Sequence, residues 1–162
     1  MDINFLAILG AALIPTIVGF IYYNPKFGLG KAWMSASGVT EDMAKTGNMA
    51  VIFGVSLLLS VMLSFILMTL VVHQMHIFSL FDGFTDAASQ EEMKGLLTAY
   101  GDRFRSFGHG ALHGTIAGLF IVLPVLGTNA LFEHKGFKYI AVNVGYWVIT
   151  LALMGGVICR FS

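Results

Sequence analysis

Two histidines, His109 and His113, stand four residues apart in an apolar part of the chain. On an α-helix, side chains at positions i and i+4 share one face, so the two imidazole rings lie near each other. Imidazole nitrogens ligate transition metals and haem iron, and they carry protons where water reaches them. The pair is therefore open to three interpretations: a metal or haem site, a pathway for protons or a small solute, or neutral rings hydrogen-bonded inside a helix bundle.

A second polar group lies in the last apolar stretch of the chain. Asn143, Trp147 and Thr150 share one helix face there, with Tyr146 beside them. An amide in the membrane interior needs a hydrogen-bond partner. We expect His109 or His113 to be that partner across a helix interface, or else the backbone near Pro124. The group predicts either a polar network that joins helices or a contact with a substrate.

The stretch His73–His76 holds two histidines and a methionine, a combination that suits Cu(I). It directly follows an apolar run, at the point where polar residues normally begin. Methionine also commonly fills gaps in apolar cores. We therefore interpret this stretch as the polar boundary of a membrane span rather than as a copper site.

The remaining side chains form no catalytic constellation. The single cysteine, Cys159, excludes an internal disulfide and a zinc site built from several cysteines. No serine–histidine or serine–lysine nucleophile motif is present, and the apolar runs contain no Asp or Glu to carry protons or sodium. We predict that the protein is not an enzyme and uses no cofactor, apart from the metal or haem alternative at the histidine pair. A formal net charge of zero argues against nucleic-acid binding.

Four apolar runs must position these residues, and each is long enough to cross a lipid bilayer, which takes about 20 helical residues. The runs cover residues 5–23, 49–72, 107–132 and 139–159, and none contains a charged side chain. Charged residues make up only 11% of the 162-residue chain, too few to cover the surface of a soluble domain. The sequence predicts an all-α integral membrane protein, a single domain of four transmembrane helices.

The second connection between the runs contains a short helix signal. Ser89–Glu92 has the spacing of a capping box, and an apolar face follows at Met93, Leu96, Leu97 and Tyr100. We predict a short amphipathic helix that lies along the membrane surface or caps the bundle. Five lysines in the first and third connections, against four Lys and Arg residues on the other side, slightly favour both termini outside the cytoplasm.

Small residues recur at four-residue intervals in two of the runs. The ladders are Gly110, Gly114 and Gly118 in the third run and Ser56, Ser60 and Ser64 in the second. Such ladders let another helix approach closely, and close packing is what holds helices together in lipid. They predict helix packing within the bundle or a seam between chains.

The favoured functional interpretation is a non-catalytic helix-packing module that forms a homo-oligomer or joins a larger membrane complex as an accessory subunit. Its basis is the small-residue ladders together with the missing catalytic and ion-carrying groups. One alternative is a channel or small-solute transporter with a path lined by His109, His113 and Asn143. The other is a metal or haem site at His109 and His113.

Three stretches of the chain together form a signature. They are residues 22–34, which begin Tyr-Tyr-Asn-Pro-Lys-Phe-Gly; residues 127–133; and residues 143–147, followed by Met154-Gly155-Gly156. The signature resembles that of a bacterial integral-membrane family of unknown function, domain-of-unknown-function family seventeen-sixty-one. The resemblance covers nearly the whole chain. It implies a multi-pass protein of the bacterial inner membrane with four spans, and it implies no activity.

Overall fold

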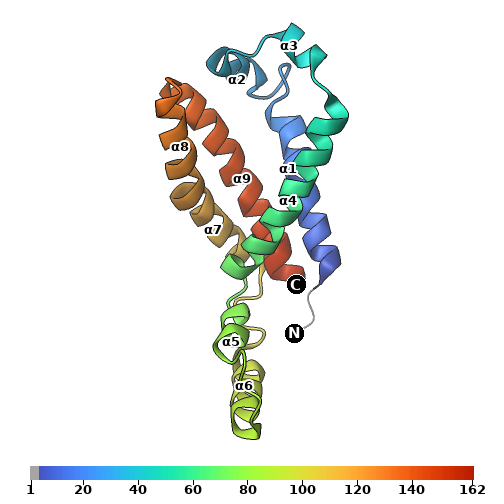
Figure 1. Ribbon diagram of the computed structural model, residues 1–162, viewed down its shortest axis with the longest axis vertical. Helices are drawn as coiled ribbons and strands as arrows, with labels where there is room; N and C mark the ends of the chain where they lie inside the picture. The colour runs from blue at the N-terminus through green and yellow to red at the C-terminus, as the bar shows by residue number, and fades with distance from the viewer. Residues whose placement is uncertain (1–3) are drawn as a thin grey trace.

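The computed structural model describes residues 4–162, and all the regular structure in this range is helical. In chain order the elements are α1 (Phe5–Tyr22), α2 (Gly30–Ser37), α3 (Glu41–Thr46), α4 (Met49–Val71), α5 (Gln74–Leu80), α6 (Ala87–Tyr100), α7 (Phe107–Ala117), the π-helical turn η1 (Gly118–Val122), α8 (Leu123–Phe132) and α9 (Phe137–Phe161). The predicted all-α fold is confirmed (Figure 1).

Four helical segments are long and apolar enough to cross a membrane. They are α1, α4, the continuous run from α7 through η1 to α8, and α9. Their ends agree with the predicted runs to within two residues. The agreement arises because a bilayer of about 30 Å sets the length of each apolar run.

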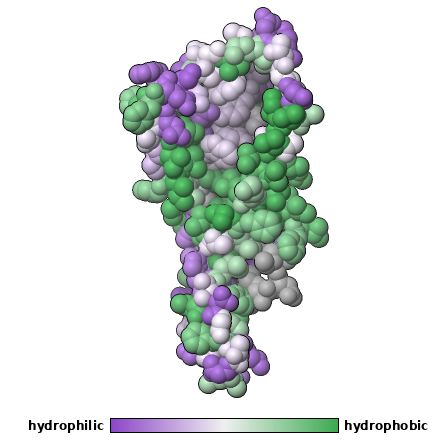
Figure 2. All heavy atoms as spheres, viewed as in Figure 1, coloured by the Kyte–Doolittle hydropathy of each residue, from purple (hydrophilic) through white to green (hydrophobic). Residues whose placement is uncertain are grey.

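Helix α9 is the centre of the bundle and packs against α1, α4 and α7. In its most apolar 18-residue stretch, half of the residues are buried inside the chain, whereas the buried share in the other spans is 22–33%. The largest fully buried apolar side chains come from α1, α4 and α9: Ile8, Leu67, Val71, Leu151, Met154 and Ile158. Apolar side chains also cover the outside of the bundle at mid-height (Figure 2), as expected where lipid is the solvent.

The connections lie at two ends of the bundle. The short helices α2 and α3 lie at one end, where Lys135 Nζ donates to the carbonyl of Ser37 over 2.8 Å and so joins the first and third connections. Helices α5 and α6 project from the opposite end (Figure 1). The first and last helices also meet at that end, where Asn4 Nδ2 donates to the carbonyl of Phe161 over 2.7 Å.

The helix predicted in the second connection exists, but its predicted start and one of its two predicted placements are wrong. It begins at Ala87 and not at Ser89, because Asp86 is the N-cap and accepts hydrogen bonds from the backbone N–H and the hydroxyl of Ser89 at 2.9 and 2.7 Å. It also does not cap the bundle, because α5 and α6 extend away from it. The hydrogen bonds from Ser89 hold the pKa of the exposed Asp86 carboxyl below its ordinary value.

Candidate metal centre

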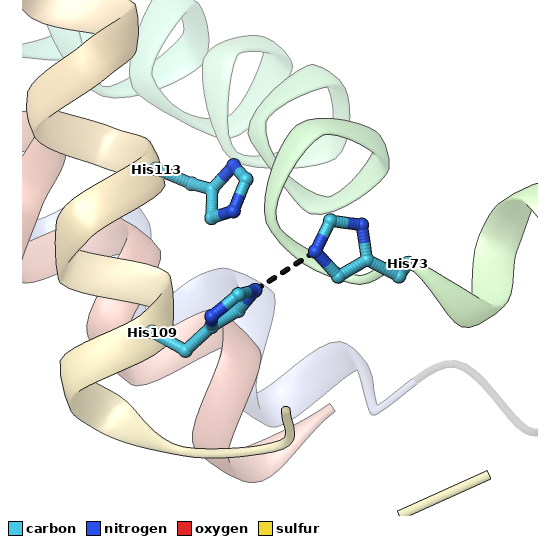
Figure 3. A group of neighbouring side chains, drawn as sticks. All are labelled: His73, His109 and His113. Atoms are coloured by element: carbon cyan, nitrogen blue, oxygen red, sulfur yellow. Dashed lines mark hydrogen bonds between the residues drawn. The ribbon is translucent and has the colours of Figure 1, made fainter. Parts of the chain in front are cut away.

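Three histidines converge where the second and third spans meet the α5–α6 end of the bundle. His109 and His113 point from one face of α7 toward His73, which lies in the turn between α4 and α5 (Figure 3). One ring nitrogen from each residue lies within 4.8 Å of the other two. The closest pair is His73 Nε2 and His109 Nε2, 2.8 Å apart and hydrogen-bonded. The structure therefore adds a third imidazole to the pair that the sequence indicates.

Local sequence fixes both sides of this cluster. Ser106 is the N-cap of α7, and its hydroxyl accepts the backbone N–H of His109 over 3.2 Å, so the helix begins two residues before His109. His73 lies two residues beyond the end of α4, after the buried Val71 and Val72. The span that ends there therefore places His73 beside the first turns of α7.

Gln74 ties the His73 turn to the loop that precedes α7. Its side chain is only 4% exposed, and its Nε2 donates to the carbonyls of Tyr100 and Arg103 over 2.8 and 2.9 Å. The same loop is tied to α9 because the Cys159 thiol donates to the carbonyl of Phe104 over 3.3 Å. The three imidazoles are thus held by contacts outside the cluster, which limits how far they can separate.

Phe104 covers one side of the cluster. Its ring stacks on His109 with centroids 4.9 Å apart and an interplanar angle of 16°, and its edge faces His73 at 6.0 Å. The residue has a φ of 65°, a left-handed conformation that costs a non-glycine residue about 1–3 kcal/mol. This conformation places the Phe104 ring against the imidazoles of His109 and His73.

The electrostatics of the cluster favour neutral imidazoles. Burial lowers the pKa of His73, and the neighbouring His109 and His76 lower it further because like charges repel. The guanidinium of Arg103 lies over the ring of Phe104, 4.9 Å from its centroid. A neutral imidazole has a free lone pair, which is the form that binds a metal ion.

The donor set fits a transition metal. Imidazole nitrogens bind Zn²⁺ at about 2.0–2.1 Å, which in a tetrahedron places ligand atoms roughly 3.3 Å apart. The observed separations, from 2.8 Å up to the 4.8 Å limit, bracket that value. In the described residues the cluster contains histidines alone, and sites without carboxylates suit Zn²⁺, Cu²⁺, Fe²⁺ or Ni²⁺ rather than Mg²⁺ or Ca²⁺.

Asn143 is not a partner of the histidines, so that expectation is wrong. Its Oδ1 accepts the hydroxyl of Tyr23 over 3.1 Å, and its Nδ2 donates to the carbonyl of Tyr139 over 2.8 Å. Tyr23 follows the end of α1 and lies at the α2–α3 end of the bundle. The amide is thus satisfied by a residue from a connection, which helix periodicity does not reveal.

Among the other members of the Asn143 group, Tyr146 bonds to a neighbouring helix. The Tyr146 hydroxyl donates to the carbonyl of Pro15 over 2.8 Å, on the neighbouring α1. Thr150 is fully buried in α9. Trp147 is half-buried beside Tyr146, with ring centroids 5.1 Å apart. Tyr146 thus joins α9 to α1, whereas Trp147 borders a hollow lined by residues of η1 and α8.

The glycine ladder lies in an interface within the chain. A Cβ at Gly110 would overlap the carbonyl of Gly155, and one at Gly114 would overlap the carbonyl of Leu151. A Cβ at Gly118 would lie 2.8 Å from the Cα of Val148. Because α9 covers this face of α7 and η1, the ladder brings two backbones of the same chain into contact.

The serine ladder is only partly enclosed. Ser60 and Ser64 are buried, and their hydroxyls donate to the carbonyls four residues earlier, at Ser56 and Ser60, over 2.8 and 2.9 Å. Ser56 is exposed on the outward half of α4. The two buried hydroxyls are satisfied within α4, so they need no polar partner from another helix.

His73 is the member of the cluster that the sequence pattern does not connect with His109 and His113. Its neighbour His76 drew attention to a copper motif within one segment, whereas the partners of His73 lie 36 and 40 residues further along the chain. The positions of the three histidines could have indicated their proximity, because His73 follows the end of one span and His109 and His113 lie at the start of the next. Antiparallel spans joined by one connection bring such ends to the same side of the membrane.

These features define a four-span helical membrane protein with a tri-histidine cluster at one end of the bundle. The family model described as "Protein of unknown function (DUF1761)" matches residues 6–159, and the chain belongs to this family. No curated protein and no solved structure matches the chain.

Proposed function

We propose that this protein binds a divalent transition-metal ion through His73, His109 and His113 at the surface of the bacterial inner membrane. The observation that carries the proposal is the convergence of three imidazole nitrogens within 4.8 Å of one another. Three protein nitrogens leave one position of a tetrahedral ion open to water or another ligand. We propose a binding role for this centre, because the sequence contains no recognisable catalytic constellation.

A purely structural role accounts for less of the geometry. One hydrogen bond, between His73 and His109, explains why those two rings meet. It does not explain why the His113 ring lies 4.5 Å from that of His109 and 5.0 Å from that of His73. A third converging imidazole, held without a hydrogen bond to the other two, is what a metal ion requires.

A solute path along His109, His113 and Asn143 is not supported by the same observations. Gly110 and Gly114, next to the two histidines, pack at the level of Gly155 and Leu151 on α9. Asn143 lies eight residues before Leu151, about 12 Å further along the helix at 1.5 Å per residue. Its amide is also occupied by Tyr23, so the three side chains do not border one space.

Assembly into a homo-oligomer or a larger complex is a separate proposal. The glycine ladder is not available for it, because α9 covers that face. A seam between chains would use the outward half of α4, where residues 51–59 are exposed and Gly54 has no neighbour within 4 Å. Native mass spectrometry of gently extracted protein tests this: multiples of 17.6 kDa support a homo-oligomer, and a monomer alone contradicts it.

Titration with Zn²⁺ tests the metal site. The protein is purified in detergent, stripped with a chelator and titrated with Zn²⁺ alone, and we expect one ion per chain. Replacing a residue that merely orients a ligand weakens metal binding by about 10–100-fold, so His73→Ala, which removes a ligand, should weaken it by at least about 100-fold. Equal Zn²⁺ affinity in the variant and the unsubstituted protein would overturn the proposal.

His134→Asn is the matched control for this titration. His134 lies in the connection between α8 and α9, at the opposite end of the bundle. Its φ of 56° is a left-handed conformation, which asparagine tolerates better than most residues. The variant should bind Zn²⁺ as the unsubstituted protein does, and a parallel loss of affinity would show that Zn²⁺ binds to surface histidines without selection.

A further inference from the structure

A polar pocket of about 440 Å³ lies beside the metal centre, between α5, α6 and the end of α9. Its polar lining comes from Gln74, Asp102, Arg105 and Arg160, and Phe78 and Leu97 form an apolar side. Gln74 directly follows the proposed ligand His73 in the chain, but the pocket contains none of the three histidines. It is therefore a second candidate site.

The pocket lies at the level where the spans end. Arg105 precedes the third span by two residues, Arg160 is in the last turn of α9, and Gln74 follows the second span by three residues. In a bilayer this is the depth of the lipid phosphates. Basic pockets between spans at this level bind phosphorylated headgroups.

The charged groups of the pocket are of both signs. The Arg105 Nε donates to the carbonyl of Cys159 over 3.2 Å, which fixes the base of its guanidinium at the wall of the pocket. Arg160 and Asp102 are exposed, and neither forms an ion pair within residues 4–162. Two guanidinium groups suit a phosphate, because their N–H donors match its oxygens, while a carboxylate suits a cationic or hydroxyl substituent.

Gln74 supplies an independent indication of a ligand. Both hydrogens of its amide nitrogen are engaged by backbone carbonyls, but its Oε1 is buried and accepts no hydrogen bond from the described residues. A buried carbonyl oxygen without a donor is destabilising. Gln74 lines the pocket but its Oε1 is enclosed, so an N–H or O–H group of a ligand satisfies this oxygen once the Gln74 side chain turns toward the pocket.

We propose that this pocket binds a phosphate ester whose substituent carries hydrogen-bond donors. The phosphate lies against Arg105 and Arg160, and the donor substituent lies against Asp102 and the Gln74 Oε1. An ethanolamine or glycerol headgroup of a phospholipid has this chemistry, and Phe78 and Leu97 would contact the glycerol backbone of the lipid. A soluble phosphate ester such as glycerophosphoethanolamine has the same polar groups.

Lipid exchange measured by native mass spectrometry tests the proposal. The full chain is delipidated in detergent and supplied with phosphatidylethanolamine, phosphatidylglycerol or phosphatidylcholine. Phosphatidylcholine has the phosphate but no N–H or O–H donor, so we expect about tenfold weaker retention, the equivalent of one lost charge-assisted hydrogen bond. Equal retention of all three lipids would overturn the proposal.

Two variants test the assigned residues. Arg160→Gln should lower the retention of phosphatidylethanolamine and phosphatidylglycerol about tenfold, and Asp102→Asn should lower the preference for ethanolamine over choline. Lys94→Gln is the matched control, since Lys94 is an exposed cation of α6 at the same end of the molecule but outside this pocket. An equal loss in Lys94→Gln and Arg160→Gln would mean non-specific attraction to charge, and it would overturn the proposal.

The source of the ligand is resolved by competition. If glycerophosphoethanolamine displaces the retained lipid and binds alone with similar affinity, the pocket serves a soluble phosphate ester. If only the diacyl lipid binds, the pocket is a lipid site. Failure of both ligands to bind would overturn the proposal, and it would leave the Zn²⁺ titration of the histidine cluster unaffected.

Discussion

Replacing Gly114 with alanine should separate α7 from α9. The added Cβ would overlap the carbonyl oxygen of Leu151 and would lie 2.9 Å from the Cα of Ala152. Both obstacles are backbone atoms of α9, so no side-chain rotation relieves them. Ordinary contacts begin at 3.4 Å, so the two helices would have to move apart by more than an ångström where the Cβ overlaps the Leu151 carbonyl oxygen.

The magnitude follows from the cost of overpacking. One extra methyl group in a well-packed interface costs about 1–3 kcal/mol. In a chain of this length, 1 kcal/mol lowers the unfolding midpoint by roughly 2–4 °C. We therefore expect Gly114→Ala to lower the midpoint by roughly 2–12 °C. Because His113 precedes Gly114, the same movement should also weaken Zn²⁺ binding.

Thermal unfolding in detergent, followed by circular dichroism, measures this change. Gly54→Ala is the control, because Gly54 lies inside the membrane-spanning α4 and a Cβ there meets nothing within 4 Å. That variant should keep or slightly raise the midpoint, since alanine favours a helix over glycine. An unchanged midpoint in Gly114→Ala would refute the argument. A changed particle mass with an unchanged midpoint would place the ladder between chains instead.

Two further predictions concern other polar groups. Tyr23→Phe leaves the Asn143 Oδ1 without its donor and should cost about 1–3 kcal/mol, seen as a lower unfolding midpoint; an unchanged midpoint would contradict the assigned bond. The second uses pH. Because burial and the charges of His109 and His76 lower the pKa of His73, the folded protein protonates it only below the ordinary value of about 6.5. Zn²⁺ should therefore remain bound below pH 6.5 and dissociate as pH falls through the folded pKa. As pH falls from about 6.5 to the folded pKa of His73, the free energy of unfolding of the metal-free protein should decrease, because the unfolded chain binds that proton first. Below the folded pKa it should level off. Dissociation of Zn²⁺ at or above pH 6.5 would contradict the sign of the shift.

The spans were predictable because the physics that sets them is local. A run of about 20 apolar residues must form a helix in lipid, where no other segment satisfies its backbone. Helix starts depend on local sequence where a capping side chain is adjacent, as at Thr40, whose hydroxyl accepts the Met43 N–H over 3.2 Å. Where two capping residues lie close together, the sequence does not show which one begins the helix. Asp86 and Ser89 both suit an N-cap, and in the structure the Asp86 carboxylate accepts the Ser89 N–H.

The contacts between segments were not predictable from periodicity. The i, i+4 spacing shows that His109 and His113 share a face, but it does not show which helix end that face meets. The position of His73 depends on where α4 ends relative to α7, a property of the packed bundle. For Asn143, the sequence showed the need for a partner, and the fold supplied Tyr23 from a connection. For Gly110, Gly114 and Gly118, the spacing predicted close contact with another helix, and the structure shows that this helix is α9.

X-ray absorption spectroscopy of the Zn²⁺-loaded protein is the most direct measurement of the proposed centre. The proposed centre should give a first shell of three imidazole nitrogens at about 2.0–2.1 Å, with the multiple-scattering pattern of histidine rings, and one further ligand such as a water oxygen. In His113→Ala the count should fall to two imidazoles, and in His134→Asn it should stay at three. A shell of oxygen atoms alone, or the same imidazole count in His113→Ala as in the unsubstituted protein, would contradict a metal centre at His73, His109 and His113.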